Sequence, residues 1–308
     1  MSQSFIAVRA WAQSGWLASG PQAQKEMRLI PIALLCLVAA LLQVHLLQMA
    51  CPALEQSLID NLKTFHTNLP VYRSRLLTIT LVRILGGDLQ AYLAVIFFSL
   101  LVGGLLSWRL YGGGGLAIYH VGFAFFAAPW FQPWDCLGAT LFTAFVILVV
   151  EGWPVAWFMG LFAIAILDRQ SAMFMALWMV LSGRMVWSGL ACGAFGLLLM
   201  YYFQHTGQPN LGLNLMQGRD GFSRNWTSDY AFIVLPENLR QLLVLPINWL
   251  AKGTIVVTAA AALHVMQTQV ALGLMFLALL VATLTFGSID ELRVWLPFIP
   301  LFIVAVKE

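Results

Sequence analysis

Long runs of apolar residues make up most of the chain, and they are separated by short polar turns and by two longer polar segments. A run of about 20 apolar residues crosses the roughly 30 Å hydrocarbon layer of a bilayer as one α-helix. No run shows the alternating pattern of a membrane β-barrel. We therefore predict an all-α fold, a polytopic transmembrane helical bundle of about ten spans. The predicted spans are residues 29–50, 89–108, 116–131, 136–150, 153–167, 172–181, 185–203, 245–265, 270–286 and 294–306.

The first long polar segment, residues 51–88, holds the densest group of ionisable residues in the sequence. Apolar residues recur at helical spacing on both sides of Pro70. This spacing predicts two amphipathic interfacial helices that lie on the membrane surface and are joined at residues 68–70. The second long segment, residues 204–245, is rich in Gly, Asn, Pro and aromatic residues, which is typical of a folded surface loop.

The order of the segments predicts which of them share a side of the membrane. Residues 1–28 form a cytoplasmic or interfacial segment, and residues 29–308 form a single transmembrane domain whose first span acts as an uncleaved signal anchor. Counting alternate crossings then places the segments 51–88 and 204–245 on one face, the outer one. The turns at Asp135, at Asp168-Arg169 and at Glu291-Arg293 fall on that same face.

The distribution of positive charge leaves a second topology open. Six Lys and Arg residues fall on the predicted cytoplasmic side, and the others fall outside; the six are Arg9, Lys25, Arg28, Arg109, Arg184 and Lys307. The positive-inside rule is weakest for charges in long translocated segments, and an anionic ligand on the outer face would require an excess of arginine there. The alternative is an inverted orientation, or one short span fewer.

Composition excludes a soluble domain. The chain is 61% hydrophobic and 9% charged, with a mean hydropathy of +0.84, whereas soluble domains carry about 25% charged residues. The net charge of +3 is spread between the spans, so no nucleic-acid partner is expected. The four cysteines lack ligand or redox spacing. We expect buried, inert thiols, no metal site and no cofactor.

Two carboxylates in the first polar segment are candidate catalytic residues. Asp60 and Glu55 follow the first span, and a partly desolvated carboxylate there suits a general base acting on a hydroxyl. The alternative is the solvated polar face of an interfacial helix. The nearby Tyr72, Arg73 and Arg75 offer two planar guanidinium groups that match phosphate oxygens. Contact with lipid headgroups is the alternative for this cluster.

The adjacent pair Asp168 and Arg169 lies between two short apolar runs. A charge at that depth is costly unless it is paired, so Arg169 is expected to contact an acid, with Asp168, Asp135 and Glu291 as the candidates. An ion pair that holds a broken helix is the structural alternative. Glu291 and Arg293 are two positions apart, so on a helix they diverge and reach different partners.

Four short motifs together resemble a group of bacterial multispan membrane proteins. In this sequence they read Pro70-Val71-Tyr72-Arg73-Ser74-Arg75-Leu76, Trp134-Asp135, Asp168-Arg169-Gln170-Ser171 and Glu291-Leu292-Arg293. The group has an acid and a threonine where this chain has Gln170 and Ser171. Its members look like glycosyltransferases of the GT-C type, which take a sugar from a polyprenyl-phosphate donor on the outer face of the membrane, and many have no assigned activity.

The resemblance implies a multi-pass protein of the bacterial inner membrane that transfers a sugar from a polyprenyl-phosphate donor to an envelope glycan or lipid acceptor. It implies that Asp60 or Glu55 deprotonates the acceptor. Arg73, Arg75, Arg169 and Arg293 would then hold the departing lipid phosphate, which needs no metal. Two alternatives stay open: a non-enzymatic scaffold or anchor that binds partner membrane subunits and lipids, and an envelope-polymer polymerase.

Overall fold

The computed structural model describes residues 21–50, 76–127, 133–205, 230–243, 249–286 and 292–307. Within these ranges the protein is helical and contains no strand, which confirms the predicted all-α class. The elements are α2 (Pro21–Ala50), α5 (Leu76–Ile84), α6 (Leu89–Ala127), α7 (Pro133–Glu151), α8 (Val155–Ile166), η1 (Gln170–Ala172), α9 (Met173–Leu181), α10 (Val186–His205), α12 (Tyr230–Leu243), α13 (Trp249–Thr268), α14 (Val270–Phe286), η3 (Leu292–Phe298) and α15 (Ile299–Lys307).

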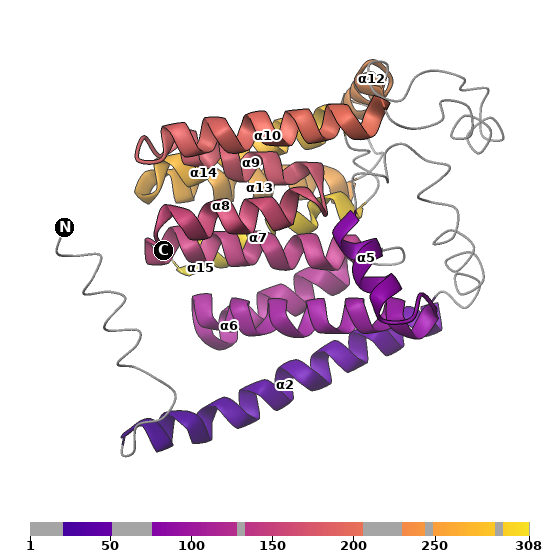
Figure 1. Ribbon diagram of the computed structural model, residues 1–308, viewed down its shortest axis with the longest axis vertical. Coiled ribbons are helices and arrows are strands. Elements are labelled where there is room, and N and C mark those ends of the chain that lie inside the picture. Colours follow the sequence, from indigo (N-terminus) through magenta and orange to yellow (C-terminus); the bar gives the residue numbers. More distant parts are fainter. Residues whose placement is uncertain are drawn as a thin grey trace.

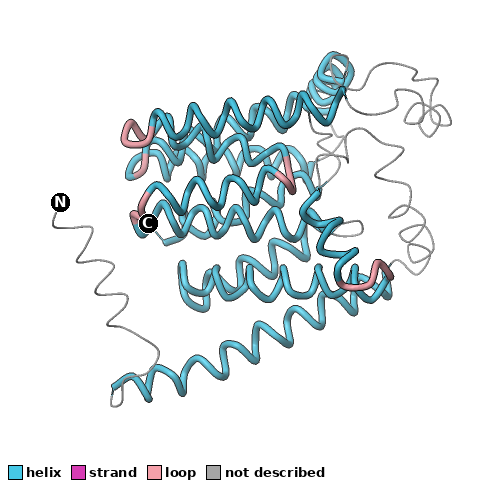
Figure 2. The backbone as a smooth tube through the Cα atoms, in the orientation of Figure 1, coloured by secondary structure: helices cyan, strands magenta, loops and turns pink. Residues whose placement is uncertain are grey.

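The long helices lie side by side and run back and forth between the two ends of a bundle (Figure 1). At one end α2 and α14 finish and α7 and α13 begin, and α5 crosses this end at a steep angle to the bundle. We call it the α5 end. At the opposite end α7 and α9 finish and α8 and α10 begin, joined by short turns (Figure 2).

Helix α6 is two antiparallel helices joined by a break in the backbone. Tyr111 (φ −148°, ψ 34°) and Gly112 (φ 55°, ψ −143°) depart from helical geometry, and the positive φ of Gly112 is one that glycine adopts without strain. The chain then folds back on itself so closely that a methyl group at Gly115 would overlap the Ser107 carbonyl. The chain therefore turns within the glycine run at residues 112–115, between the predicted spans 89–108 and 116–131.

The helix positions expected from the apolar runs agree with the observed elements to within a few residues, apart from α2, which begins eight residues earlier at Pro21. Within the described part of the chain, two stretches are suited to crossing a membrane by length and composition, Leu89–Phe126 and Trp249–Thr268. The first of these is the α6 hairpin, so it comprises two antiparallel arms. Several further apolar helices are shorter, among them α8, α9 and α15.

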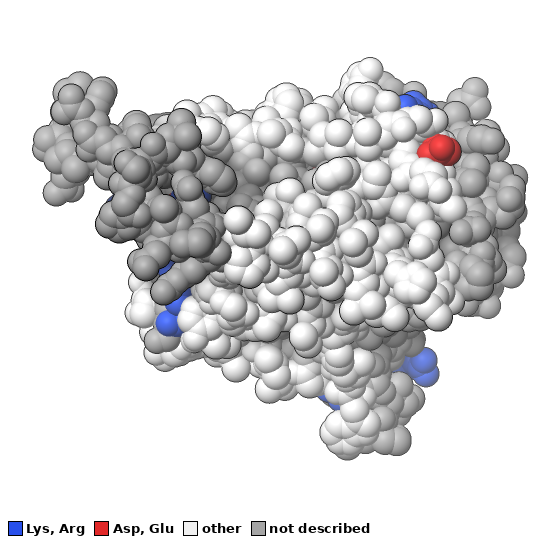
Figure 3. All heavy atoms as spheres, turned by 90° about the horizontal axis from the view of Figure 1, so that it is seen from below, with Lys and Arg blue, Asp and Glu red and all other residues white. Residues whose placement is uncertain are grey.

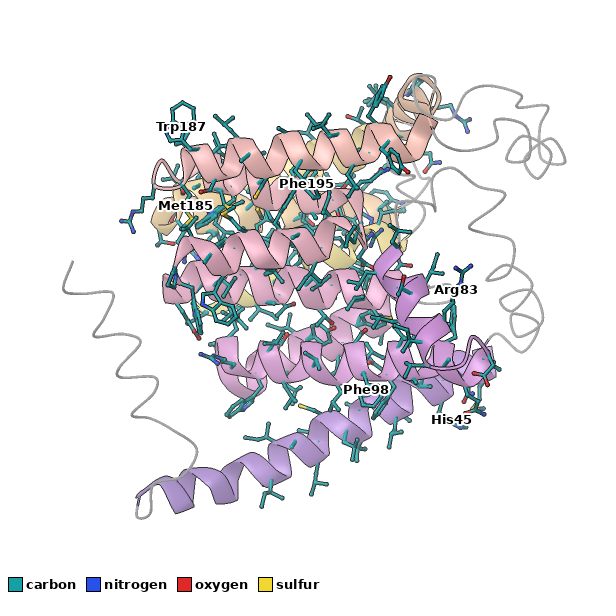
Figure 4. The ribbon with its side chains drawn as sticks, viewed as in Figure 1. His45, Arg83, Phe98, Met185, Trp187 and Phe195 are labelled. Atoms are coloured by element: carbon teal, nitrogen blue, oxygen red, sulfur yellow. The ribbon has the colours of Figure 1, made fainter. Side chains whose placement is uncertain are left out.

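Apolar side chains fill the interior of the bundle and also cover much of its outside. The interior includes large fully buried side chains such as Trp295, Tyr92 and Phe276. On the outside, Trp187 of α10 is 84% exposed and projects away from the bundle (Figure 4). Figure 3 shows one face on which uncharged atoms cover the centre and the few charged side chains lie at the edges. Exposed apolar surface of this extent is typical of contact with lipid or a partner.

Candidate functional site

The site begins at the break between α8 and α9. Helix α8 ends at Ile166, and Arg169 has an extended backbone (φ −146°, ψ 140°) before the short helix η1 begins. The local sequence explains the break, because the apolar run is interrupted by Asp168, Arg169, Gln170 and Ser171. The extended residue lets neighbouring side chains leave the chain in different directions, which a continuous helix would not.

Arg169 forms an ion pair with Asp135, the acidic residue in the first turn of α7. The Arg169 Nη1 atom lies 3.2 Å from Asp135 Oδ1. To reach it, the arginine stem crosses α7 at Gly138, where an added Cβ would lie 2.7 Å from Arg169 Cδ. The predicted acidic partner of Arg169 is thus confirmed, and of the three candidates this contact identifies Asp135.

Asp168 turns the other way and contacts α5. Its Oδ1 atom accepts a hydrogen bond from the Thr78 hydroxyl, and the preceding Leu167 carbonyl accepts one from the Leu77 amide at 2.9 Å. These two bonds place the start of α5 on the α8–α9 break. We call Thr78, Asp135, Asp168 and Arg169 the acid–arginine cluster.

The members of the acid–arginine cluster differ in how far solvent or lipid can reach them. Asp135 and Asp168 are 1% and 0% exposed, whereas the Arg169 side chain keeps 17% of its surface exposed. Removing a partner from a buried ion pair costs about 3–5 kcal/mol. The Asp135–Arg169 ion pair therefore fixes the positions of both side chains. Arg169 is the member that a ligand can touch.

A lateral cavity of about 360 Å³ lies between α5, the first arm of α6 and α7. Its walls are almost entirely carbon, with Ser99 and Thr140 as the polar members. The Thr140 hydroxyl is occupied within the helices, since it donates to the Ser99 carbonyl at 2.8 Å. At the mouth, Phe98 is 56% and Leu85 is 52% exposed, and Figure 4 shows Phe98 on the side of α6.

The acid–arginine cluster and the lateral cavity share two helices, although no member of the cluster lines the cavity. On α5, Leu81 lines the cavity one turn after Thr78. On α7, Leu137 lines it two residues after Asp135, and positions two apart on a helix face different ways. The cluster therefore lies next to an apolar cavity that is open on the side of the bundle.

The structure describes three of the ten sequence-predicted site residues in full, Asp135, Asp168 and Arg169, and it brings them together. Arg293 lies in η3, but its side chain is outside the described set. The remaining candidates, Glu55, Asp60, Tyr72, Arg73, Arg75 and Glu291, lie outside the described residues. Their expected roles stay predictions.

Sequence reasoning missed Thr78 and Gly138. Thr78 lies on the buried face of α5 together with Ile79 and Val82, and a hydroxyl on an otherwise apolar face signals a buried hydrogen bond. Gly138 interrupts an apolar helix, where glycine is unfavourable by about 1 kcal/mol unless something packs close to it.

A second polar contact lies at the opposite end of the bundle. Arg109 forms two hydrogen bonds with Glu151, each 2.8 Å long, and the Trp153 indole donates to the same carboxylate at 2.7 Å. Arg109 is 44% exposed, so this contact joins helix ends at the surface and encloses no site. Among the described residues, no group of three His, Cys, Asp or Glu side chains is placed to hold a metal ion.

Comparison of the chain with protein-family models, with curated proteins and with solved structures finds no match. The geometry of the site is therefore the basis for the functional proposal.

Proposed function

We propose that the protein is a multi-pass membrane protein of the bacterial inner membrane that transfers a sugar from a polyprenyl-phosphate donor to an envelope glycan or lipid. The observation that carries the proposal is the buried acid–arginine cluster beside a lateral apolar cavity that shares helices α5 and α7 with it. This combination suits a ligand with an anionic head and an apolar chain that approaches from the bilayer.

The membrane assignment is supported by the apolar surface of the bundle and by the length of its helices. The described helices expose large apolar side chains along α2, α10 and α13, and α10, with 20 residues, is about 30 Å long. That length equals the hydrocarbon thickness of a bilayer. Among the described residues, ten helical segments run between the two ends, counting the two arms of α6 and joining η1 with α9 and η3 with α15, which agrees in number with the proposed ten spans.

The cavity supports a lipid as the substrate. An apolar cavity that is open on the side of the bundle leaves its carbon walls without dispersion contacts unless an apolar chain fills it. A cavity of 150 Å³ already binds small apolar molecules, so about 360 Å³ can hold a segment of an isoprenoid chain.

The cluster supports an anionic head. Arg169 is the cation of the cluster, and a guanidinium matches the geometry of phosphate oxygens, while Asp135 fixes its position. Because Asp135 and Asp168 together outweigh the charge of Arg169, the anionic head requires further arginines. In this proposal Arg73, Arg75 and Arg293 add donors to the departing phosphate, and Asp60 or Glu55 takes the proton of the acceptor hydroxyl. The sugar then moves directly from the phosphate oxygen to the acceptor oxygen.

Binding is tested with the purified protein in nanodiscs and undecaprenyl phosphate as the probe. The wild type should bind the probe more tightly than undecaprenol, which lacks the phosphate. Leu137→Trp, which fills the cavity, should reduce binding at least tenfold, whereas Leu190→Trp, on the exposed side of α10, should leave it unchanged. Equal binding of undecaprenyl phosphate and undecaprenol would overturn the lipid-phosphate assignment.

Sugar transfer is tested in the host with Asp60→Ala and Arg73→Ala. Both variants should insert and fold normally but lose the glycan product. If the products are unchanged in both, or if the protein copurifies stoichiometrically in an assembly unrelated to glycans, the transferase function is wrong and the scaffold function replaces it.

A further inference from the structure

Helix α5 differs from the other helices of the bundle in direction. It has nine residues, too few to span a bilayer, and it crosses the end of the bundle instead of running along it (Figure 1). Thr78, Ile79 and Val82 are buried, whereas Thr80 and Arg83 are exposed, and Figure 4 shows Arg83 pointing away from the bundle. The helix therefore lies on the bundle as a cover.

The second end of α5 is a pair of glycines with positive φ, Gly86 (126°) and Gly87 (71°). The Gly87 amide donates to the Val82 carbonyl at 2.9 Å, which closes the last turn of α5. Asp88 then begins α6 independently, because its side chain accepts a hydrogen bond from the Ala91 amide at 2.8 Å. Two separately capped helices thus meet at an exposed glycine pair. The φ and ψ of Gly87 can change without breaking either cap, whereas a change at Gly86 would break the Gly87–Val82 hydrogen bond.

The lateral cavity begins next to α5. Leu81 of α5 and Leu85, the residue after this helix ends, form one wall, and the other walls belong to the long helices α6 and α7. Those two helices are joined by the buried Thr140–Ser99 and Tyr119–Thr140 hydrogen bonds. The short helix is therefore the wall that can move.

We propose that α5 is a hinged cover at one end of the lateral cavity, which turns at Gly87 and is held in place by the Thr78–Asp168 and Leu77–Leu167 hydrogen bonds. This inference rests on the proposed function for the occupant, an isoprenoid chain. Movement of α5 would widen the side opening between Leu85 and Phe98 through which the isoprenoid chain enters. Because Asp168 belongs to the acid–arginine cluster, the group that would receive the phosphate also holds the cover.

The cover is tested by the reactivity of a cysteine at position 81 in a background that lacks the four native cysteines. A bilayer-soluble maleimide should modify Leu81→Cys slowly. Adding Thr78→Val removes the hydroxyl from the latch and leaves a buried carboxylate with one donor fewer, which should speed the reaction about tenfold. The matched control Thr80→Val changes the same residue type on the exposed face and should leave the rate unchanged.

A second measurement does not depend on how Thr78→Val folds. A bifunctional thiol reagent that links Leu81→Cys to Leu137→Cys across the cavity should slow uptake of undecaprenyl phosphate at least tenfold, and a reagent-treated single cysteine at position 81 is the control. Uptake at the wild-type rate by the linked protein, or equal maleimide rates with and without the Thr78→Val substitution, would overturn the cover.

The two proposals fail separately. If undecaprenyl phosphate binds to every variant equally fast and the maleimide rates do not respond to Thr78→Val, the cover is wrong and the lipid site stands. If the rates respond but undecaprenyl phosphate never binds better than undecaprenol, the cover stands and the lipid-phosphate function is wrong.

Discussion

Two ion pairs with similar chemistry differ in burial, and burial decides what each contributes. Asp135–Arg169 lies inside the bundle, with its carboxylate 1% exposed, whereas Glu151–Arg109 lies at the surface. A surface pair contributes about 0–1 kcal/mol because water and salt screen it. Water and salt do not screen a buried charge in this way, so the loss of its partner is costly.

We accordingly predict that Asp135→Asn lowers the free energy of unfolding by about 3–5 kcal/mol, since it leaves the Arg169 cation without its charged partner. The matched variant Glu151→Gln should change it by less than about 1 kcal/mol. Denaturant unfolding in detergent measures both. Equal effects would show that the Asp135–Arg169 contact is as well solvated as the surface pair.

A second prediction concerns the path of the Arg169 stem. Gly138→Ala places a methyl group 2.7 Å from Arg169 Cδ, so the arginine must shift away from Asp135, and overpacking of this kind costs about 1–3 kcal/mol. Gly160→Ala in α8 meets nothing within 4 Å and should be neutral or stabilising by up to about 1 kcal/mol. In thermal unfolding, the Tm of Gly138→Ala should therefore fall clearly below that of Gly160→Ala.

Among the elements, the α6 hairpin shows how far an apolar run specifies structure. The run and its glycines predict two helices and a turn, and both are observed. The apolar sequence does not predict how closely the two arms of α6 pack. This closeness follows from contacts such as that of Gly103 with the Tyr119 side chain, which joins positions sixteen residues apart.

The hairpin yields a third prediction. Gly115→Ala should destabilise the protein by more than about 3 kcal/mol, because the added methyl group overlaps a backbone carbonyl that cannot rotate away. Gly113→Ala, two residues earlier, meets nothing within 4 Å and is the control. Yield of monodisperse protein and its Tm are the measurements, and similar values for the two variants would contradict the tight packing of the arms.

The prediction of two amphipathic helices in residues 51–88 agrees in part with the structure. The second is observed as α5, Leu76–Ile84, and the first lies outside the described residues. Within residues 204–245, predicted as a folded loop, the structure describes the helix α12, which packs on α14 through the Asn238–Leu284 hydrogen bond of 2.7 Å.

At the scale of the whole molecule, the two long polar segments and the two chain ends border opposite ends of the bundle. The ends of the described helices that border residues 51–75 and 206–229 lie at the α5 end, whereas α2 begins and α15 finishes at the opposite end (Figure 1). This agrees with the prediction that both long polar segments share a side.

The fourth prediction tests that arrangement in the membrane. In a cysteine-free background, Arg83→Cys on α5 should react with a membrane-impermeant maleimide from the outer side. Arg184→Cys, between α9 and α10, and Lys307→Cys should react from the cytoplasmic side. Modification of positions 83 and 184 from the same side would contradict the topology, and modification of all three from the sides opposite to those stated would support the inverted orientation.

The sequence by itself determined the apolar helices, their order and the turns between them, but not α12, because each of these features depends on residues close together in the chain: apolar runs, glycine pairs and proline. It also marked Asp168 and Arg169 as a costly pair in need of a partner. Only the tertiary structure decided that the partner is Asp135, that Thr78 holds Asp168, and that α5, α6 and α7 enclose a cavity. These contacts join residues 34 to 90 positions apart. Helix packing selects them from many partners of equal chemistry, and no local pattern encodes that choice.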